Sequence, residues 1–233
     1  MTVSSTCIAT AAILLALVAP VPAQTSAPQE KVAAIKKSLQ ESQARLRQFE
    51  WIETTIVTLE GEEKSRKQSR CYYGADGVLQ KVPVAAPESG GGPRGIRGKI
   101  ARNKKEDLTE YMQAAAEMAH AYVPPDGARL QKSKDGGKAS LHATDPGKSV
   151  TLEFRDYLKA GDSLSVRLDV ANDRFQGLRV ATYLETSEDP VGLDIRYSAF
   201  PDGTGYPVEI QLDAPKKKVK VTIQNSGYRQ VGR

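Results

Sequence analysis

The sequence predicts an α+β fold in which a curved antiparallel β-sheet carries two helices on its concave side. Two segments repeat apolar residues at helical spacing, and many short segments alternate apolar with polar residues. Strands with a single apolar face are typical of antiparallel sheets packed on one side. Short turns between these strands favour pairing between neighbours in the sequence.

Composition indicates a folded chain. Of its 233 residues, 39% are hydrophobic and 26% are charged, which excludes a disordered protein. No apolar run reaches the ~18 residues of a membrane-spanning helix, so we do not expect an integral membrane protein. The length allows one domain or two small ones, and we expect a single α+β domain over residues 24–233.

The amino terminus predicts export. Residues 8–19 are nearly all apolar, and Val21-Pro22-Ala23 then forms a small-residue cleavage site. This pattern predicts a signal peptide over residues 1–23, cleaved after Ala23, and therefore a periplasmic or secreted protein. No Lys or Arg precedes the apolar stretch, which leaves a buried amino-terminal helix as the alternative.

After the predicted signal peptide, the sequence predicts a helix and then a β-hairpin. Ser26 and Gln29 form a capping pair, and apolar residues then recur at helical spacing to about residue 48. Residues 50–59 alternate like a strand, and a charged stretch leads to Tyr73. Gly74-Ala75-Asp76-Gly77 predicts a hairpin turn, after which residues 78–82 form the return strand.

A glycine-rich basic loop is expected over about 85–102. Asn103 and Glu106 form a second capping pair, which predicts a second helix over about 104–123. Pro124-Pro125 ends it. From about 139 to 225, alternating strands separated by turns predict an antiparallel meander.

This order of elements resembles that of the periplasmic carriers of outer-membrane lipoproteins, the lipoprotein-sorting superfamily. That family wraps an incomplete β-barrel around helices that plug its opening. The resemblance implies an incomplete barrel here and a cavity that accepts acyl chains. Four short sequence segments are similar to segments of a group of uncharacterised exported bacterial proteins, and this similarity implies no activity. The segments are 61–66, 71–74, 122–125 and 225–229.

The stretch from Glu62 to Tyr73 is unusual because both of its faces carry charge. Arg66 and Arg70 share one face, while Cys71 lies on the other. A charged edge strand that resists aggregation is one interpretation. The other is a cationic rim for an anionic head group.

Further basic residues lie in the loop, at Arg94, Arg97 and Lys99, and in a lysine turn over 216–220. They indicate an anionic surface of the envelope as a partner. Sparse aromatic residues, 6% of the chain, and export argue against nucleic acid. Met112 and Met118 on the second helix suit a flexible lid over apolar ligands. The predicted ligand-binding residues are Arg66, Arg70, Arg94, Arg97, Lys99, Met112 and Met118.

No residue pattern indicates catalysis. Cys71 is alone once Cys7 leaves with the signal, and neither His120 nor His142 has a spaced metal-ligating partner. We therefore expect no enzyme, no metal and no cofactor.

Two hypotheses for function remain. The first is an exported envelope protein that binds or carries an amphiphilic, lipid-like ligand or a lipoprotein. The second is a periplasmic interaction or scaffold module that has a basic surface and no internal ligand. An apolar hollow beneath the helices favours the first, and a packed interior favours the second.

Overall fold

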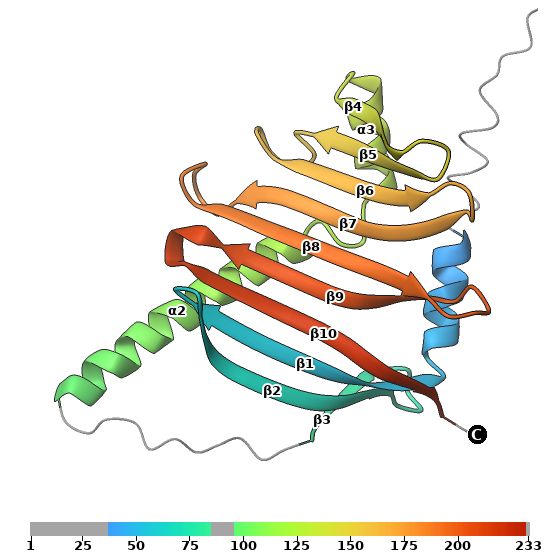
Figure 1. Ribbon diagram of the computed structural model, residues 1–233. Coiled ribbons are helices and arrows are strands. Elements are labelled where there is room, and N and C mark those ends of the chain that lie inside the picture. Colours follow the sequence, from blue (N-terminus) through green and yellow to red (C-terminus); the bar gives the residue numbers. More distant parts are fainter. Residues whose placement is uncertain (1–36, 85–95, 232–233) are drawn as a thin grey trace, which may run out of the picture.

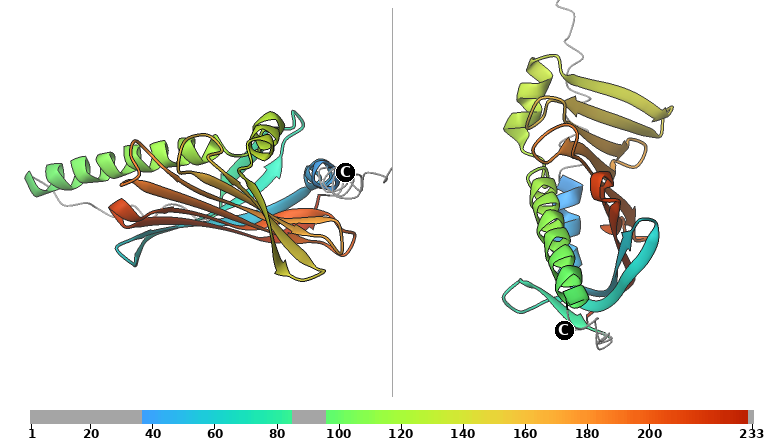
Figure 2. Two further views of the ribbon diagram at one scale, coloured as in Figure 1. Left: turned by 90° about the horizontal axis from the view of Figure 1, so that it is seen from above. Right: turned by 90° about the vertical axis from the view of Figure 1, so that its left-hand side faces the viewer.

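A computed structural model describes residues 37–84 and 96–231, with the backbone alone for residues 96–105. Within these residues, ten antiparallel strands form one open sheet with the order β3-β2-β1-β10-β9-β8-β7-β6-β5-β4. The sheet is curved and does not close into a barrel (Figures 1 and 2). The predicted α+β class and incomplete barrel are therefore confirmed.

The strands follow the alternating segments of the sequence. Their bounds are β1 Phe49–Leu59, β2 Glu62–Tyr73, β3 Leu79–Pro83, β4 Ala139–Asp145, β5 Ser149–Arg155, β6 Ser163–Asp169, β7 Arg174–Tyr183, β8 Pro190–Ala199, β9 Gly205–Ala214 and β10 Val219–Gln230. Sequence neighbours pair as predicted, except that β1 also pairs with β10. This long-range pairing joins the first hairpin to the later meander and leaves β3 and β4 at the two edges.

Three helical segments lie on the same face of the sheet (Figure 2). They are the helix over 37–46, α2 (Ile96–His120) and α3 (Gly127–Asp135). A short 3-10 turn, η1 (Pro215–Lys217), precedes β10. The predicted signal peptide, the Ser26–Gln29 capping pair and residues 85–95 lie outside the described residues.

The helices differ from the prediction in two places. α2 begins at Ile96 rather than near residue 104, because Asn103 and Glu106 are also tolerated inside a helix and do not force a start there. α3 was not predicted, since its polar sequence offers no repeated apolar face. Asp126 caps it by accepting a hydrogen bond from the Arg129 backbone nitrogen at 2.8 Å.

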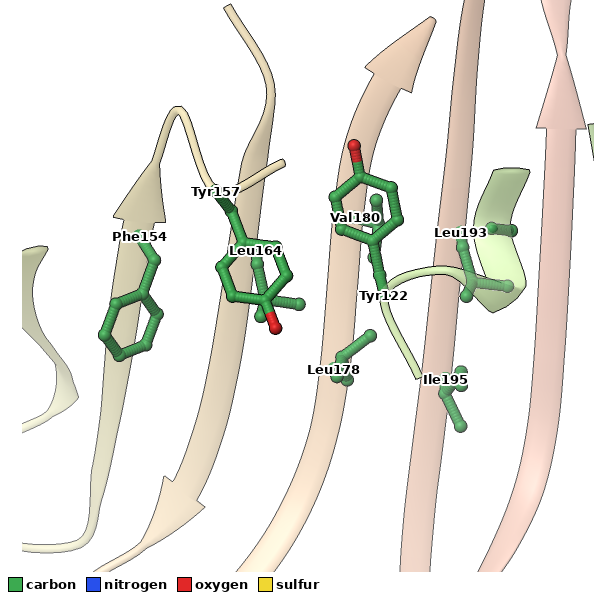
Figure 3. Packing of buried hydrophobic residues seen from close by; sticks show 9 residues of the cluster. Tyr122, Phe154, Tyr157, Leu164, Leu178, Val180, Leu193 and Ile195 are labelled. Carbon is green, nitrogen blue, oxygen red and sulfur yellow. The ribbon is translucent and has the colours of Figure 1, made fainter. Parts of the chain in front are cut away.

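The apolar side chains form rows across the sheet on its helix-covered face. One row runs through Ile223, Ile210, Ile195, Leu178, Val166 and Leu152, which are partners in successive strand pairs. Figure 3 shows the core cluster, where Tyr122 and Tyr157 lie over residues from β5 to β8. The next residue on each strand faces the opposite, convex side. These residues are mostly polar on β5 to β9, whereas β1 places Ile52 and Ile56 there.

Candidate functional site

The concave face of the sheet is covered unevenly. Its apolar rows are largely buried on β6, β7 and β8, next to the carboxyl-terminal end of α2. On β9, β10 and β1 most residues of these rows are only half-buried, although Ala214 and Val219 next to η1 are fully buried. We call these half-buried residues the apolar strip, and they are Val57, Leu59, Ile210, Leu212, Val221 and Ile223. The described residues thus leave part of the concave face open to an apolar ligand.

A small cavity lies where the helix over 37–46 meets the ends of β7 and β8. Its volume is about 180 Å³, and Leu39, Ser42, Phe175 and Tyr197 are among the residues that line it. The rings of Phe175 and Tyr197 meet edge to face with centroids 4.9 Å apart. Pockets for drug-sized ligands span ~300–1,000 Å³, so this cavity is too small for a long acyl chain.

Beside this cavity, six aromatic side chains form a continuous group that we call the aromatic band. Successive ring centroids are 5.0 Å apart for Phe49 and Phe200, 4.2 Å for Phe200 and Tyr206, and 4.6 Å for Tyr206 and Tyr228. Trp51 follows at 5.5 Å from Tyr228 and 6.0 Å from Tyr73. Apart from Trp51, which is buried, these rings are half-buried.

A β-bulge places Tyr228 in this band. Asn225 pairs with Glu53 of β1, but the register shifts between Glu50 and Ile52, and Gly227 in β10 has φ 63°. Glycine adopts this left-handed conformation without strain. The extra residue in β10 lets both Asn225 and Tyr228 face the concave side. Burial raises the pKa of Tyr228, and neighbouring tyrosines add to the shift.

Cys71 lies next to this band and is fully buried. Burial raises the pKa of its thiol, and the nearby Glu53 carboxylate raises it further. Glu53 accepts hydrogen bonds from Lys81 Nζ at 2.8 Å through both carboxylate oxygens. These surroundings favour the neutral thiol, which is a poor nucleophile.

A buried hydrogen-bond network holds the chain just after α2. The Tyr122 hydroxyl donates to Asp162 Oδ2 at 2.6 Å and lies 2.7 Å from Thr182 Oγ1. Asp162 also accepts from the backbone nitrogens of Tyr157, Leu158 and Lys159, at 2.5 to 3.0 Å. Burial and the bond to Asp162 raise the pKa of Tyr122 well above its usual value.

A second contact holds the middle of α2. The Tyr111 hydroxyl donates to Asp189, a buried residue just before β8. Lys216 Nζ binds the other oxygen of Asp189 at 3.2 Å, and Lys217 Nζ lies 5.5 Å from the Tyr111 ring centroid. Two lysines of the predicted basic turn therefore contact the Tyr111–Asp189 pair that holds α2 against the sheet. Burial, together with Asp189, raises the pKa of Tyr111.

The structure places the predicted arginines of β2 away from the helices. Arg66 pairs in register with Ile56, and Arg70 pairs with Ile52, so both face the convex side. Arg66 binds Glu63 at 2.8 and 2.9 Å. Arg70 Nη1 lies 4.0 Å from Glu50. A head group held by these arginines would not reach a ligand on the concave face.

Met112 and Met118 lie on α2 and are both half-buried, and Met118 packs against the core cluster. Arg97 and Lys99 lie in the first turn of α2, where the structure describes the backbone alone. Arg94 lies outside the described residues. The described part of the predicted set is thus divided between the two faces of the sheet.

The histidines lie apart from this face. His120 is exposed, and His142 is exposed on β4, where its Nε2 lies 3.4 Å from Glu153. Within residues 37–84 and 96–231, no three His, Cys, Asp or Glu side chains gather to hold a metal ion. No helix of this described part is long and apolar enough to cross a membrane.

Several residues of this face were missed from the sequence. The helical spacing indicated that Tyr111 and Tyr122 lie on the apolar face of the second helix. Their bonds to Asp189 and Asp162 gave no signal, because these contacts join positions distant in the chain. Aromatic residues at alternate strand positions, such as Phe49 and Trp51, could have indicated the aromatic band.

No protein-family model matches the chain, and no curated protein matches it. Among solved structures, a DUF1329 family protein from Desulfovibrio piger aligns with a TM-score of 0.38 and 9% sequence identity, over 86% of this chain and 92% of that one. A LolA superfamily protein from Nitrosomonas europaea aligns with a TM-score of 0.36 and 11% identity, over 85% and 94%.

A putative outer membrane lipoprotein-sorting protein domain from Vibrio parahaemolyticus aligns with a TM-score of 0.35 and 13% identity, over 84% of this chain and 93% of that one. The names of the last two structures are those of the superfamily that the order of elements resembles. At these TM-scores the likeness carries no argument about ligand or activity.

Proposed function

We propose that this protein is an exported, non-catalytic envelope protein that binds an amphiphilic ligand on the concave face of its sheet. The observation that carries the proposal is the apolar strip, which continues the core rows onto β9, β10 and β1 but is only half-buried. The predicted signal peptide, cleaved after Ala23, would deliver the protein to the periplasm or beyond.

Burial of an acyl chain along this strip supplies the affinity. Each buried methylene contributes about 0.8 kcal/mol, so ten methylenes contribute about 8 kcal/mol before the entropic costs of binding. Half-buried Met112 and Met118 on α2 can adapt to such a chain, because the thioether side chain is flexible.

The binding test uses a fluorescent fatty-acid probe and native mass spectrometry of the mature protein. Val221→Asp places a charge in the apolar strip, and we expect it to weaken binding at least about tenfold. Thr222→Asp is the matched control, because Thr222 is the next residue of β10 and faces the convex side. The absence of saturable binding in well-folded protein would reject the proposal, and so would equal loss in both variants.

A scaffold function is the second candidate, and exposed apolar residues at the sheet edges favour it. Val82 and Leu79 on β3 are 41% and 38% exposed, and Leu141 on β4 is 64% exposed. Edge strands of this kind pair readily with another chain. A stable protein complex recovered from the periplasm, together with no bound lipid, would favour this candidate over the carrier.

We also propose that the basic surface attracts anionic membranes. Lys218 and Lys220 are exposed at the lysine turn, so Lys218→Gln with Lys220→Gln should weaken cosedimentation with phosphatidylglycerol vesicles. Lys132→Gln with Lys134→Gln on α3 is the control, because it removes the same number of positive charges at another position on the surface. Because the Debye length is ~8 Å at physiological salt, added salt should release the protein. Binding that salt does not change would contradict this proposal.

A further inference from the structure

Trp51 of the aromatic band and Asn225 beside it each carry a buried polar atom without a hydrogen-bond partner among the described residues. Trp51 is 8% exposed, and its Nε1 has no acceptor. Asn225 Oδ1 has no donor, although the amide nitrogen of Asn225 donates to the Pro207 carbonyl at 3.3 Å. Buried polar groups are nearly always paired in native proteins, so both atoms indicate a missing partner.

The two residues lie on neighbouring strands, β1 and β10, and both belong to the concave face. Asn225 pairs with Glu53 of β1, and Trp51 lies two residues from Glu53 on the same face. That spacing corresponds to about 7 Å along the strand. The bulge at Gly227 places the Tyr228 ring on the same face, 5.5 Å from the Trp51 ring. The Tyr228 hydroxyl and the Asn225 amide nitrogen both donate to the Pro207 carbonyl. Tyr228 thus neighbours both the residue with the unpaired donor and the residue with the unpaired acceptor.

The charged groups described nearby compensate one another. Glu53 holds Lys81 through both carboxylate oxygens at 2.8 Å, and the Glu53 side chain is only 12% exposed. A ligand that reaches Trp51 and Asn225 therefore meets aromatic rings and the Glu53–Lys81 ion pair, in which the two charges neutralise each other. This arrangement differs from the cationic rim expected from the sequence.

The chemistry of the two orphan atoms restricts the ligand. A carboxylate accepts hydrogen bonds but cannot donate to Asn225 Oδ1, and an ammonium donates but cannot accept from Trp51 Nε1. A hydroxyl group does both. Half-buried rings alongside offer a flat apolar surface on which a hydroxylated ring can stack.

We infer that the aromatic band is the head-group site of the carrier and that it selects an uncharged, hydroxyl-rich head group such as a sugar. The inference rests on the proposed function, because the apolar strip begins beside the band, where Ile223 and Val57 lie on the same strands as Asn225 and Trp51. An acyl chain lies along the strip, and its head group lies on the aromatic band.

The test measures Trp51 fluorescence, since Trp51 is the single tryptophan of the chain. Decyl glucoside, decyl phosphate and decyltrimethylammonium are titrated below their micelle concentrations. We expect decyl glucoside to bind at least about tenfold more tightly than the two charged compounds and to shift the Trp51 emission. Equal affinities, or tighter binding of decyl phosphate, would overturn the inference.

Two variants assign the effect to the orphan acceptor. Asn225→Leu removes Oδ1 and should weaken decyl glucoside about fivefold or more, while decyl phosphate binding stays within about twofold. Gln224→Leu is the matched control, because Gln224 is the neighbouring residue on the exposed convex face. If Asn225→Leu leaves decyl glucoside binding unchanged, the inference is wrong. The ligand series on the parent protein decides the matter even if this variant does not fold.

The same titrations separate this inference from the proposed function. If all three decyl compounds bind saturably with equal affinity, the proposed function stands and the head-group site is rejected. If free glucose changes Trp51 fluorescence as strongly as decyl glucoside does, the hydroxyl-binding site stands and the proposed binding of an acyl chain is rejected. Preference for decyl glucoside with no response to glucose supports both.

Discussion

At the scale of single residues, the buried Tyr122 hydroxyl decides how firmly the end of α2 is attached. It is hydrogen-bonded to Asp162, whose other partners are backbone nitrogens of the loop before β6. Loss of the hydroxyl leaves a buried carboxylate with one donor fewer. We expect Tyr122→Phe to lower the free energy of unfolding by about 1–3 kcal/mol, measured by urea denaturation.

Tyr183→Phe is the control for this change. Its hydroxyl donates to the Ala160 carbonyl at 2.8 Å in an exposed position, where water can replace the bond. We expect a loss below about 1 kcal/mol. Similar losses in the two variants would show that burial of the Tyr122 network adds nothing to stability.

At the scale of elements, α2 is held at its middle by Asp189 and at its end by Tyr122. Asp189→Ala removes the acceptor for Tyr111 and Lys216 at once. Hydrogen bonds to a charged group contribute about 1.5–3 kcal/mol, so amide exchange in residues 106–120 should accelerate about ten- to a hundredfold. Hydrogen exchange followed by mass spectrometry measures this change.

Glu188, the residue before Asp189, provides the control for the exchange measurement on α2. Glu188 is exposed, and Glu188→Ala should leave the exchange of α2 unchanged. Equal acceleration in α2 and in strands β6 to β8 would contradict a local attachment, because it would report global unfolding instead.

The sequence predicted elements well where the pattern was local. Alternation along 164–168 and 191–195 indicated β6 and β8 and the side of each that is buried, because side-chain direction has a period of two. The start of α2 could not be located, since Asn103 is compatible with both a cap and a helix interior. The polar helix α3 had no apolar period to detect.

The site was harder to predict, because it depends on which face of each strand meets the helices. Alternation showed that Arg66 and Cys71 lie on opposite faces, but only the register with β1 shows that Cys71 lies on the concave one. The bulge at Gly227 reverses the direction of Tyr228, which a strict alternation would have placed on the convex side. The pairing of β1 with β10 joins residues about as far apart as the domain allows, and no local pattern specifies it.

At the scale of the whole molecule, buried and half-buried tyrosines make stability depend on alkaline pH. Burial raises the pKa of Tyr111, Tyr122 and Tyr228 in the native state above the value of 10.0 for an accessible tyrosine. The native state therefore holds these protons more tightly than the unfolded state does. Their contribution to stability is complete below pH about 10 and is lost as pH rises from there toward the native pKa values.

We therefore expect the free energy of unfolding to fall above pH about 10, with each such tyrosine adding a slope of up to about 1.4 kcal/mol per pH unit. Urea midpoints collected between pH 8 and pH 11, a range of about three units around the tyrosine pKa, measure this slope. Burial also raises the pKa of Tyr157 and Tyr197. The double variant Tyr122→Phe with Tyr228→Phe removes two of these five groups, so its stability should decline less steeply than that of the parent. Parallel declines would mean that these phenols ionise as freely in the folded protein as in the unfolded chain, which would contradict their placement in the core and the aromatic band.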